Sequence, residues 1–173
     1  MKGTIVKCLK ETVTTRFGED KWQEICTRSD FPEESIISVS RDIDDEKVMQ
    51  LFESTCAVLD ISFPQAADAF GDYFVNEYAP NIYISIFNRF HNSRDFLLGM
   101  DDVHVTTTQN LPGAKPPRFT YSLPDERTII MNYQSHRNLI DVLVGLVKGV
   151  GRYFNENLTV TKQDETTIKV GFD

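Results

Sequence analysis

The chain has 173 residues and a formal net charge of −8, from 18 basic and 26 acidic side chains. Neutralising phosphates takes a basic face, so this balance argues against general nucleic-acid binding and against contact with an anionic membrane surface. Hydrophobic residues make up 40% of the chain and aromatic residues 11%. That is enough apolar material for one core, and we expect residues 1–173 to form a single domain.

The cysteines and the chain start carry little further signal. Cys8, Cys26 and Cys56 contain no C-x-x-C pair, so neither a disulfide framework nor a zinc site is indicated. No stretch approaches the roughly 20 apolar residues of a membrane span, and the start lacks the apolar run of a secretory signal. We therefore expect a cytoplasmic protein.

The first half of the chain has apolar residues at helical spacing. Acidic residues at 42–45 suit a helix N-terminus, and Ser62 with Gln65 form a capping-box pattern. Gly18 is suited to end the first helix. The predicted helical segments are 5–17, 22–26, 48–59, a helix from Ser62 that presents Ala66, Phe70, Tyr73 and Phe74, and an aromatic-rich segment over 82–90.

A further helix is expected to begin at a Ser93 cap and to end at Pro112 and Gly113. Its predicted buried stripe follows steps of three and four and contains Leu97, Met100, His104, Thr107 and Leu111. Pro116 and Pro117 then enforce an extended link.

After this link the period changes to that of strands. Residues 118–122 and 128–137 alternate, with a turn at Leu-Pro-Asp-Glu between them. A helical period returns over 139–154, and 158–161 and 167–172 are expected to form a hairpin. The predicted fold class is α+β, with a helical N-terminal part followed by an antiparallel sheet that one helix interrupts.

His104 is the histidine with the most informative position, because it lies on the apolar face of its helix. His91 belongs to a polar loop, and His136 to the predicted strand. A lone histidine on an apolar face is most often a core residue that is hydrogen-bonded to a neighbour. The alternative is an axial ligand of haem iron, which uses one neutral imidazole in an otherwise apolar pocket.

Tyr133, Ser135 and Arg137 are spaced by two, so on a regular strand they would share one face. Two hydroxyls and a guanidinium at the end of an apolar row suit a ligand with an apolar body and an anionic edge. Haem, with its macrocycle and propionates, is such a ligand. The alternative is a strand end that surface hydrogen bonds satisfy, and the spacing leaves both open.

These features together resemble the H-NOX family, the haem nitric oxide/oxygen binding domains. The resemblance rests on Met1-Lys-Gly-Thr-Ile-Val, the Met-Asp-Asp-Val-His segment ending at His104, the Gly-Ala-Lys-Pro-Pro link and Tyr133-x-Ser135-x-Arg137. It covers essentially the whole chain. The family fold places haem b (iron protoporphyrin IX) between the helical part and the sheet.

The resemblance implies a role for each matching residue. His104 would be the proximal ligand of the haem iron, and Pro117 would press on the porphyrin and distort it. Tyr133, Ser135 and Arg137 would hold the propionates. The matching distal positions are Ile5, Phe74, Val142 and Leu146.

The distal positions bear on which gas is bound. Oxygen-binding family members carry a distal tyrosine, and Val142 stands at that position here. We therefore expect a sensor that binds NO and CO and excludes O2, unless Tyr73, Tyr78 or Tyr83 turns inward and supplies a donor. Gas binding would shift the helix of His104, with Gly99 and Gly113 as candidate hinges, and change a surface that a partner reads.

The family's partners include histidine kinases, cyclic-di-nucleotide enzymes, chemotaxis receptors and guanylate cyclases, and the sequence does not choose among them. Catalysis by the chain itself is disfavoured, because neighbouring acids such as Asp101 and Asp102 point about 100° apart on a helix. The sequence also lacks a phosphate loop, a nucleophile elbow and a His-Glu-x-x-His motif. A haem-free interaction module of the same fold is the remaining alternative.

Overall fold

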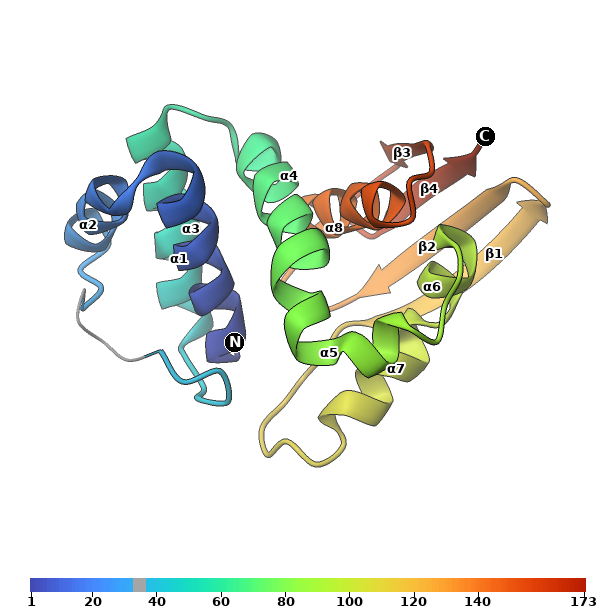
Figure 1. Cartoon of the computed structure of the whole chain (residues 1–173), viewed down its shortest axis with the longest axis horizontal. Coiled ribbons are helices and arrows are strands. Elements are labelled where there is room, and N and C mark those ends of the chain that lie inside the picture. The colour runs from blue at the N-terminus through green and yellow to red at the C-terminus, as the bar shows by residue number, and fades with distance from the viewer. Residues whose placement is uncertain (33–36) are drawn as a thin grey trace.

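A computed structural model describes residues 1–32 and 37–173 (Figure 1). The helical part comes first and the sheet second, as the sequence predicts. The helices before the sheet are α1 (Gly3–Phe17), α2 (Glu19–Arg28), α3 (Asp45–Leu59), α4 (Phe63–Tyr73), the π-helix η1 (Phe74–Tyr78), α5 (Ala79–Phe87), α6 (Ser93–Leu98) and α7 (Met100–Thr108). The α+β fold class is confirmed.

Local sequence signals explain several helix ends. Gly18 ends α1 with a φ of 98°, which a residue with a Cβ rarely adopts. Asp44 caps α3 by accepting a hydrogen bond from the Glu46 backbone N–H at 2.8 Å. Ser62 and Gln65 form the predicted capping box at the start of α4.

The sheet has four antiparallel strands in the order β1-β2-β4-β3. They are β1 (Arg118–Asp125), β2 (Thr128–Gln134), β3 (Leu158–Lys162) and β4 (Thr167–Phe172), with α8 (Ile140–Tyr153) between β2 and β3. The predicted terminal hairpin is confirmed, since Leu158 pairs with Phe172 and Lys162 with Ile168. Strand β4 also pairs with β2, which places the hairpin inside one continuous sheet.

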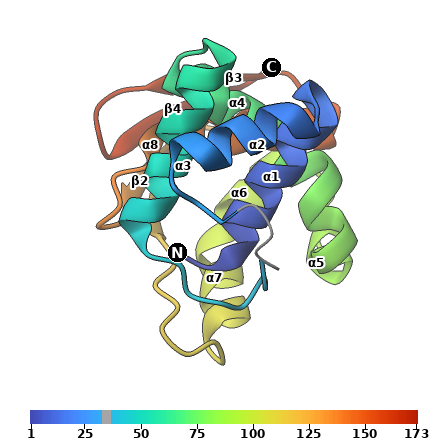
Figure 2. The same cartoon turned by 90° about the vertical axis from the view of Figure 1, so that its left-hand side faces the viewer.

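Two apolar cores flank the middle of the molecule. One joins α1, α2 and α3 and contains the fully buried Trp22 and Phe52; the other lies between α8, α6 and the sheet and contains Ile129 and Ile168. Figure 1 shows α4 between the two, and Figure 2 views α1, α2 and α3 from the front with the sheet behind them. Phe74, the first residue of η1, contacts both cores.

Helices α4 and α8 cross with their backbones in contact. A Cβ atom on Gly145 would lie 2.1 Å from the Ala67 carbonyl oxygen, and one on Gly71 would lie 2.2 Å from the Gly145 carbonyl carbon. Only glycine fits at such a distance, so this crossing fixes how the helical part meets the sheet part.

The predicted helix from Ser93 to Leu111 is wrong in three respects. Its cap is Asn92, whose side chain accepts from the Asp95 N–H at 2.7 Å, while Ser93 is the first helical residue. The helix is broken at Gly99 into α6 and α7, and it ends at Thr108. Leu111 lies beyond that end and is 41% exposed, so it is not part of the buried stripe.

The strand predicted over 128–137 ends at Gln134. Ser135, His136 and Arg137 form a turn, in which the Arg137 N–H donates to the Ser135 hydroxyl at 3.2 Å and Asn138 takes a φ of 51°. The chain must turn here because α8 begins at Ile140. The first strand continues into the predicted turn and ends at Asp125, with an irregular register between Ser122 and Asp125.

Two smaller differences concern one helix end and one residue inside a helix. Phe74 was expected on the helix that Ser62 opens, and it begins the π-helix η1 instead. Helix α5 contains a non-helical residue, Tyr83, with φ −120° and ψ 34°.

Candidate functional site

A cavity of about 370 Å³ lies between the N-terminal helices and the sheet. All nine of the residues that the sequence singled out line it. They are His104 from α7, Pro117 from the link before β1, Tyr133 from β2, Ser135 and Arg137 from the turn, and Ile5, Phe74, Val142 and Leu146 from α1, η1 and α8.

His104 lines the cavity with its imidazole largely buried. Its Nδ1 atom is buried, and no described residue makes a hydrogen bond with it. Burial lowers the pKa of His104, and the backbone of Pro117 and the carboxylate of Asp101 only partly oppose this. The ring is therefore neutral near pH 7, which is the form that ligates a metal. A core histidine with both ring nitrogens satisfied is not what the structure shows.

The floor beside His104 is a row of aromatic rings. The centroid of His104 lies 5.5 Å from that of Phe119, and the Phe119 centroid lies 6.0 Å from that of Tyr133. Both Phe119 and Tyr133 are buried and line the cavity. The row extends from His104 to Tyr133, which together with Ser135 and Arg137 would interact with the anionic edge of a ligand.

Asp101, one helical turn before His104, fixes α7 against β1. Its carboxylate accepts two hydrogen bonds from Arg118, at 2.8 and 2.7 Å, and one from the Phe119 backbone N–H at 2.8 Å. The Arg118 guanidinium lowers the pKa of Asp101 to about 2. Asp101 lies three residues before His104, so the two share a helix face, and this spacing was visible in the sequence. Sequence reasoning did not identify Asp101 as part of the site.

Arg137 faces the cavity from the turn and is already engaged. Its Nε donates to Asp45 at 2.8 Å and its Nη1 donates to the Lys115 carbonyl at 2.7 Å. A guanidinium has five N–H donors, so among the described residues three remain for an anionic ligand.

Asp45 is the acidic centre of this rim. It also accepts from the Met1 amino group at 2.5 Å, and His136 Nε2 lies 3.3 Å from it. Burial raises the pKa of Asp45, but the Met1 amine and Arg137 outweigh that effect and hold it below its usual range. His136 is exposed in this turn rather than on a strand.

The wall across from α7 is apolar at the four predicted distal positions. Phe74 lies between two rings, with centroids 5.8 Å from both Phe70 and Tyr78. Val142 presents an aliphatic side chain to the cavity, where it offers no hydrogen bond. Of the three tyrosines considered as donors, Tyr83 lines the cavity, Tyr78 is buried behind its wall, and Tyr73 is not among the lining residues.

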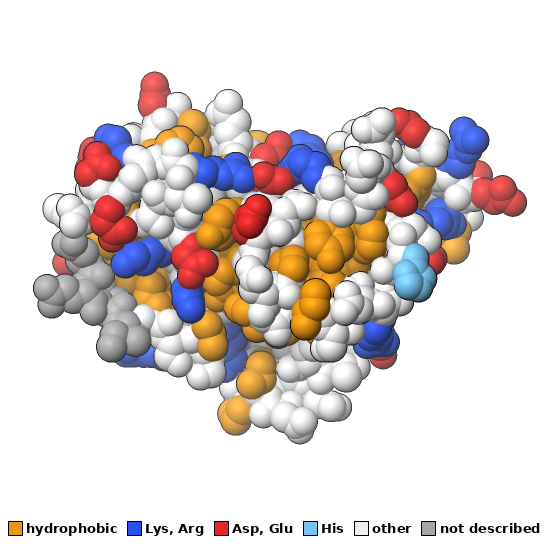
Figure 3. All heavy atoms as spheres, in the orientation of Figure 1, with side chains coloured by type: hydrophobic (Ala, Val, Ile, Leu, Met, Phe, Trp, Pro, Cys, Tyr) orange, Lys and Arg blue, Asp and Glu red, His pale blue; other side chains and the backbone are white. Residues whose placement is uncertain are grey.

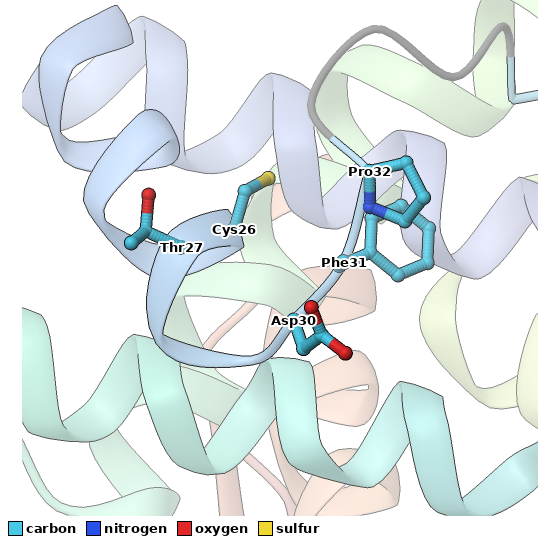
Figure 4. A pocket seen from close by; sticks show the side chains of 5 residues that line it. All are labelled: Cys26, Thr27, Asp30, Phe31 and Pro32. Atoms are coloured by element: carbon cyan, nitrogen blue, oxygen red, sulfur yellow. The ribbon is translucent and has the colours of Figure 1, made fainter.

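A second, smaller hollow lies at the C-terminal end of α2, with a volume of about 300 Å³ (Figure 4). Its lining residues are Cys26, Thr27, Asp30, Phe31 and Pro32. None of the nine predicted residues belongs to it. The large cavity is therefore the candidate site.

The cavity thus combines a largely buried, neutral imidazole with an apolar wall and a polar rim. Comparison with known proteins agrees with this. The haem-NO-binding family model matches residues 2–162. The chain belongs to this H-NOX family.

Relatives of known structure share the whole fold. An H-NOX mutant with 4-cyano-L-phenylalanine at its site 5 superposes with a TM-score of 0.89 at 25% identity, covering 100% of this chain and 97% of that one. An oxygen-binding H-NOX domain related to soluble guanylate cyclases, in its oxygen complex, gives a TM-score of 0.84 at 25% identity, with 100% and 95% covered.

Among curated proteins, soluble guanylate cyclases gcy-35 and gcy-32 of Caenorhabditis elegans are 23% and 25% identical to the chain. The matches cover 95% and 98% of this chain but only 25% and 26% of the cyclases. The chain thus spans about a quarter of the length of these relatives. In the described part of the chain, no helix is long and apolar enough to cross a membrane.

Proposed function

We propose that this domain holds haem b in the cavity, binds NO and CO there, excludes O2, and passes the binding event to a partner protein as a conformational change. The observation that carries the proposal is the neutral, buried imidazole of His104, whose Nδ1 has no partner among the described residues. Bound haem would supply an iron with an open position for a diatomic gas.

The residues present fit that group. His104 would be the axial ligand, and Pro117, which lines the cavity on the same side, would contact the macrocycle and press it out of plane. Tyr133, Ser135 and the remaining N–H groups of Arg137 would hold the propionates, sharing Arg137 with Asp45. A guanidinium and hydroxyls are suited to carboxylates because they donate charge-assisted hydrogen bonds.

Gas selectivity is proposed from the apolar distal wall. Dioxygen held at iron gains negative charge, and a hydrogen bond to a charged group contributes about 1.5–3 kcal/mol. Ile5, Phe74, Val142 and Leu146 offer no such donor. Its lack lowers O2 affinity by about ten- to a hundredfold, because each 1.4 kcal/mol is about tenfold. NO depends less on a donor.

The partner is proposed from the relatives. Two of them are guanylate cyclases, and this similarity favours a cyclase as the partner. Histidine kinases, cyclic-di-nucleotide enzymes and chemotaxis receptors are the other partner classes that the family resemblance implies. We also propose the cytoplasm as the compartment, on the sequence grounds given above.

Absorption spectra of the purified, reduced chain test the proposal. We expect a Soret band that shifts on addition of NO and of CO and does not shift in air. A stable shift in air would contradict the exclusion of O2. A chain that takes up no haem would instead be an interaction module.

The histidine assignment has its own test. His104→Gly removes the imidazole that lines the cavity, so we expect the variant to lose haem or to need added imidazole to keep it. His91→Gly is the matched control, because that exposed imidazole lies in the loop before α6 and does not line the cavity. An unchanged ferrous spectrum in His104→Gly would refute the assignment.

A further inference from the structure

Two hydroxyl groups meet at the distal wall of the cavity. Thr4, on the first turn of α1, lines the cavity, and its Oγ1 donates to the Tyr78 hydroxyl at 3.2 Å. Tyr78 is the last residue of η1 and is 5% exposed. The phenol oxygen thus lies one hydrogen-bond length behind a residue of the cavity wall.

The pair is embedded in the predicted distal wall. Thr4 precedes Ile5 on α1, and the ring of Tyr78 lies 5.8 Å from that of Phe74. Burial raises the pKa of Tyr78, so its phenol keeps its proton and remains a potential donor. This is a hydrogen-bond donor beside the four apolar distal residues Ile5, Phe74, Val142 and Leu146.

Other hydroxyls of the cavity are used differently. Thr107 and Thr108 lie on the His104 helix and donate to the Val103 and His104 carbonyls at 2.7 and 2.6 Å. They are therefore committed to their own helix and lie on the proximal side. Among the described distal residues, only the Thr4–Tyr78 bond joins one hydroxyl to another.

We propose that Thr4 is a positioning residue for gas selectivity, because its hydrogen bond holds the Tyr78 phenol behind the wall and away from the gas. The proposal rests on the proposed function, which it deepens: O2 is excluded by the missing donor at Val142 and also by this restraint. Thr4 donates to the Tyr78 oxygen, so the bond fixes the direction of the phenol and leaves its proton free. Without that bond the phenol would turn toward a ligand that carries negative charge, since a buried donor without a partner is unfavourable.

The test is Thr4→Val, which keeps the shape of the side chain and removes its hydroxyl. We expect the reduced, haem-loaded variant to gain about ten- to a hundredfold in O2 affinity, with NO and CO still bound. The gain should vanish in Thr4→Val combined with Tyr78→Phe, because the phenol that supplies it is gone.

Thr12→Val is the matched control. Thr12 lies on the same helix, is 3% exposed, and donates to the Cys8 carbonyl at 2.8 Å, but it does not line the cavity. Its substitution should leave O2 affinity unchanged. An equal gain in Thr12→Val would mean that loosening α1, rather than freeing Tyr78, changes the affinity, and would overturn the proposal.

Tyr83 lines the cavity as well and needs its own arm. A gain in Thr4→Val that survives Tyr78→Phe and disappears with Tyr83→Phe would transfer the role to Tyr83 and overturn the proposal. A fall in O2 affinity when Tyr78→Phe is made in the otherwise unchanged chain would also overturn it, because the phenol would then already reach the gas.

A second readout needs no haem. In the haem-free chain with ¹³C-labelled tyrosine, the NMR signal of Tyr78, assigned by its loss in Tyr78→Phe, should move in Thr4→Val and stay in Thr12→Val. An unmoved signal would contradict the restraint. Intact NO and CO binding without a gain in O2 affinity refutes only this proposal, whereas a chain that binds neither gas refutes the proposed function.

Discussion

Asp101 illustrates how one side chain connects the candidate ligand to the sheet. It lies one turn before His104 and accepts hydrogen bonds from the Arg118 side chain and the Phe119 backbone. The Arg118 guanidinium holds the pKa of Asp101 at about 2, so the carboxylate is charged over the whole physiological range. The position of α7 on the cavity wall therefore depends on a charged group.

Asp101→Asn should lower the free energy of unfolding by about 1–2 kcal/mol at pH 7, since it weakens one charged backbone contact and one exposed ion pair. The folded pKa lies below the usual value, so the wild-type advantage is full above about pH 4 and is lost as the pH falls toward 2. Urea unfolding at pH 7, 4 and 2 measures this. A difference between the two proteins that stayed constant down to pH 2 would show that charge is not the cause.

That the nine residues share one cavity could be predicted, because position and spacing selected His104 and Tyr133-x-Ser135-x-Arg137, and the family resemblance supplied Pro117 and the four distal residues. Asp45 could not, because it lies 92 residues from Arg137 and its role arises only when α3 meets the turn after β2. The face shared by Tyr133, Ser135 and Arg137 was predicted from strand spacing and is wrong as geometry, since only Tyr133 lies on the strand. The turn nevertheless brings all three to the same cavity.

At the scale of elements, the α4–α8 crossing determines how far apart the walls of the cavity stand. Gly145 faces the Ala67 carbonyl oxygen, where a Cβ would lie 2.1 Å away, and that neighbour is backbone, which cannot rotate aside. Val142 and Leu146 stand on the same helix and line the cavity. A shift of α8 would therefore move the distal wall.

Gly145→Ala should destabilise the protein by about 1–3 kcal/mol through overpacking. At this chain length each kcal/mol corresponds to about 2–4 °C in Tm. Gly171→Ala in β4 is the control, because its Cβ would make an ordinary contact with Thr159 at 3.7 Å. Equal thermal shifts for the two variants would contradict the close crossing.

Helix ends followed the sequence only in part. The cap of α6 is Asn92, one residue before the predicted Ser93. The Ser62–Gln65 box and Gly18 act locally, and both were predicted correctly. The break at Gly99 was not, because the apolar stripe continues across it; there a Cβ would lie 2.6 Å from the Phe90 ring, a neighbour from another segment. Tertiary contacts of this kind leave no periodic signal.

At the scale of the whole molecule, the net charge of −8 is not visible as one acidic patch on the face seen in Figure 3. Acidic and basic side chains mix at both ends of this face, and hydrophobic side chains gather toward its centre. The acidic charge therefore does not mark a partner site on this face. The change of period after Pro117 predicted the α+β order, but the β2–β4 pairing joins segments more than thirty residues apart and had no signal in the sequence.

The two cores are connected by an ion-pair cluster at Asp72 on α4. Its carboxylate accepts from Arg16 of α1 and from Arg152 of α8, both at 2.5 Å, so it contacts the helical part and the sheet part at once. Burial raises the pKa of Asp72, but the two guanidiniums outweigh it and lower the pKa below its usual range.

Asp72→Asn removes the charge and keeps the shape, and exposed pairs of this kind contribute about 0.2–1 kcal/mol each. We expect the urea midpoint to fall at pH 7. The difference from wild type should fade as the pH drops below about 4, because the unfolded carboxylate takes up a proton there and the folded one does so only at its lowered pKa. The m-value should not change, because the α4–α8 backbone contact still makes both cores unfold together.

Asp68→Asn, which removes the Lys148 pair within the α4–α8 crossing alone, is the control and should shift the midpoint less. A second transition or a lower m-value in Asp72→Asn would mean that the ion pairs, and not the helix crossing, couple α1, which carries Ile5, to α8, which carries Val142 and Leu146.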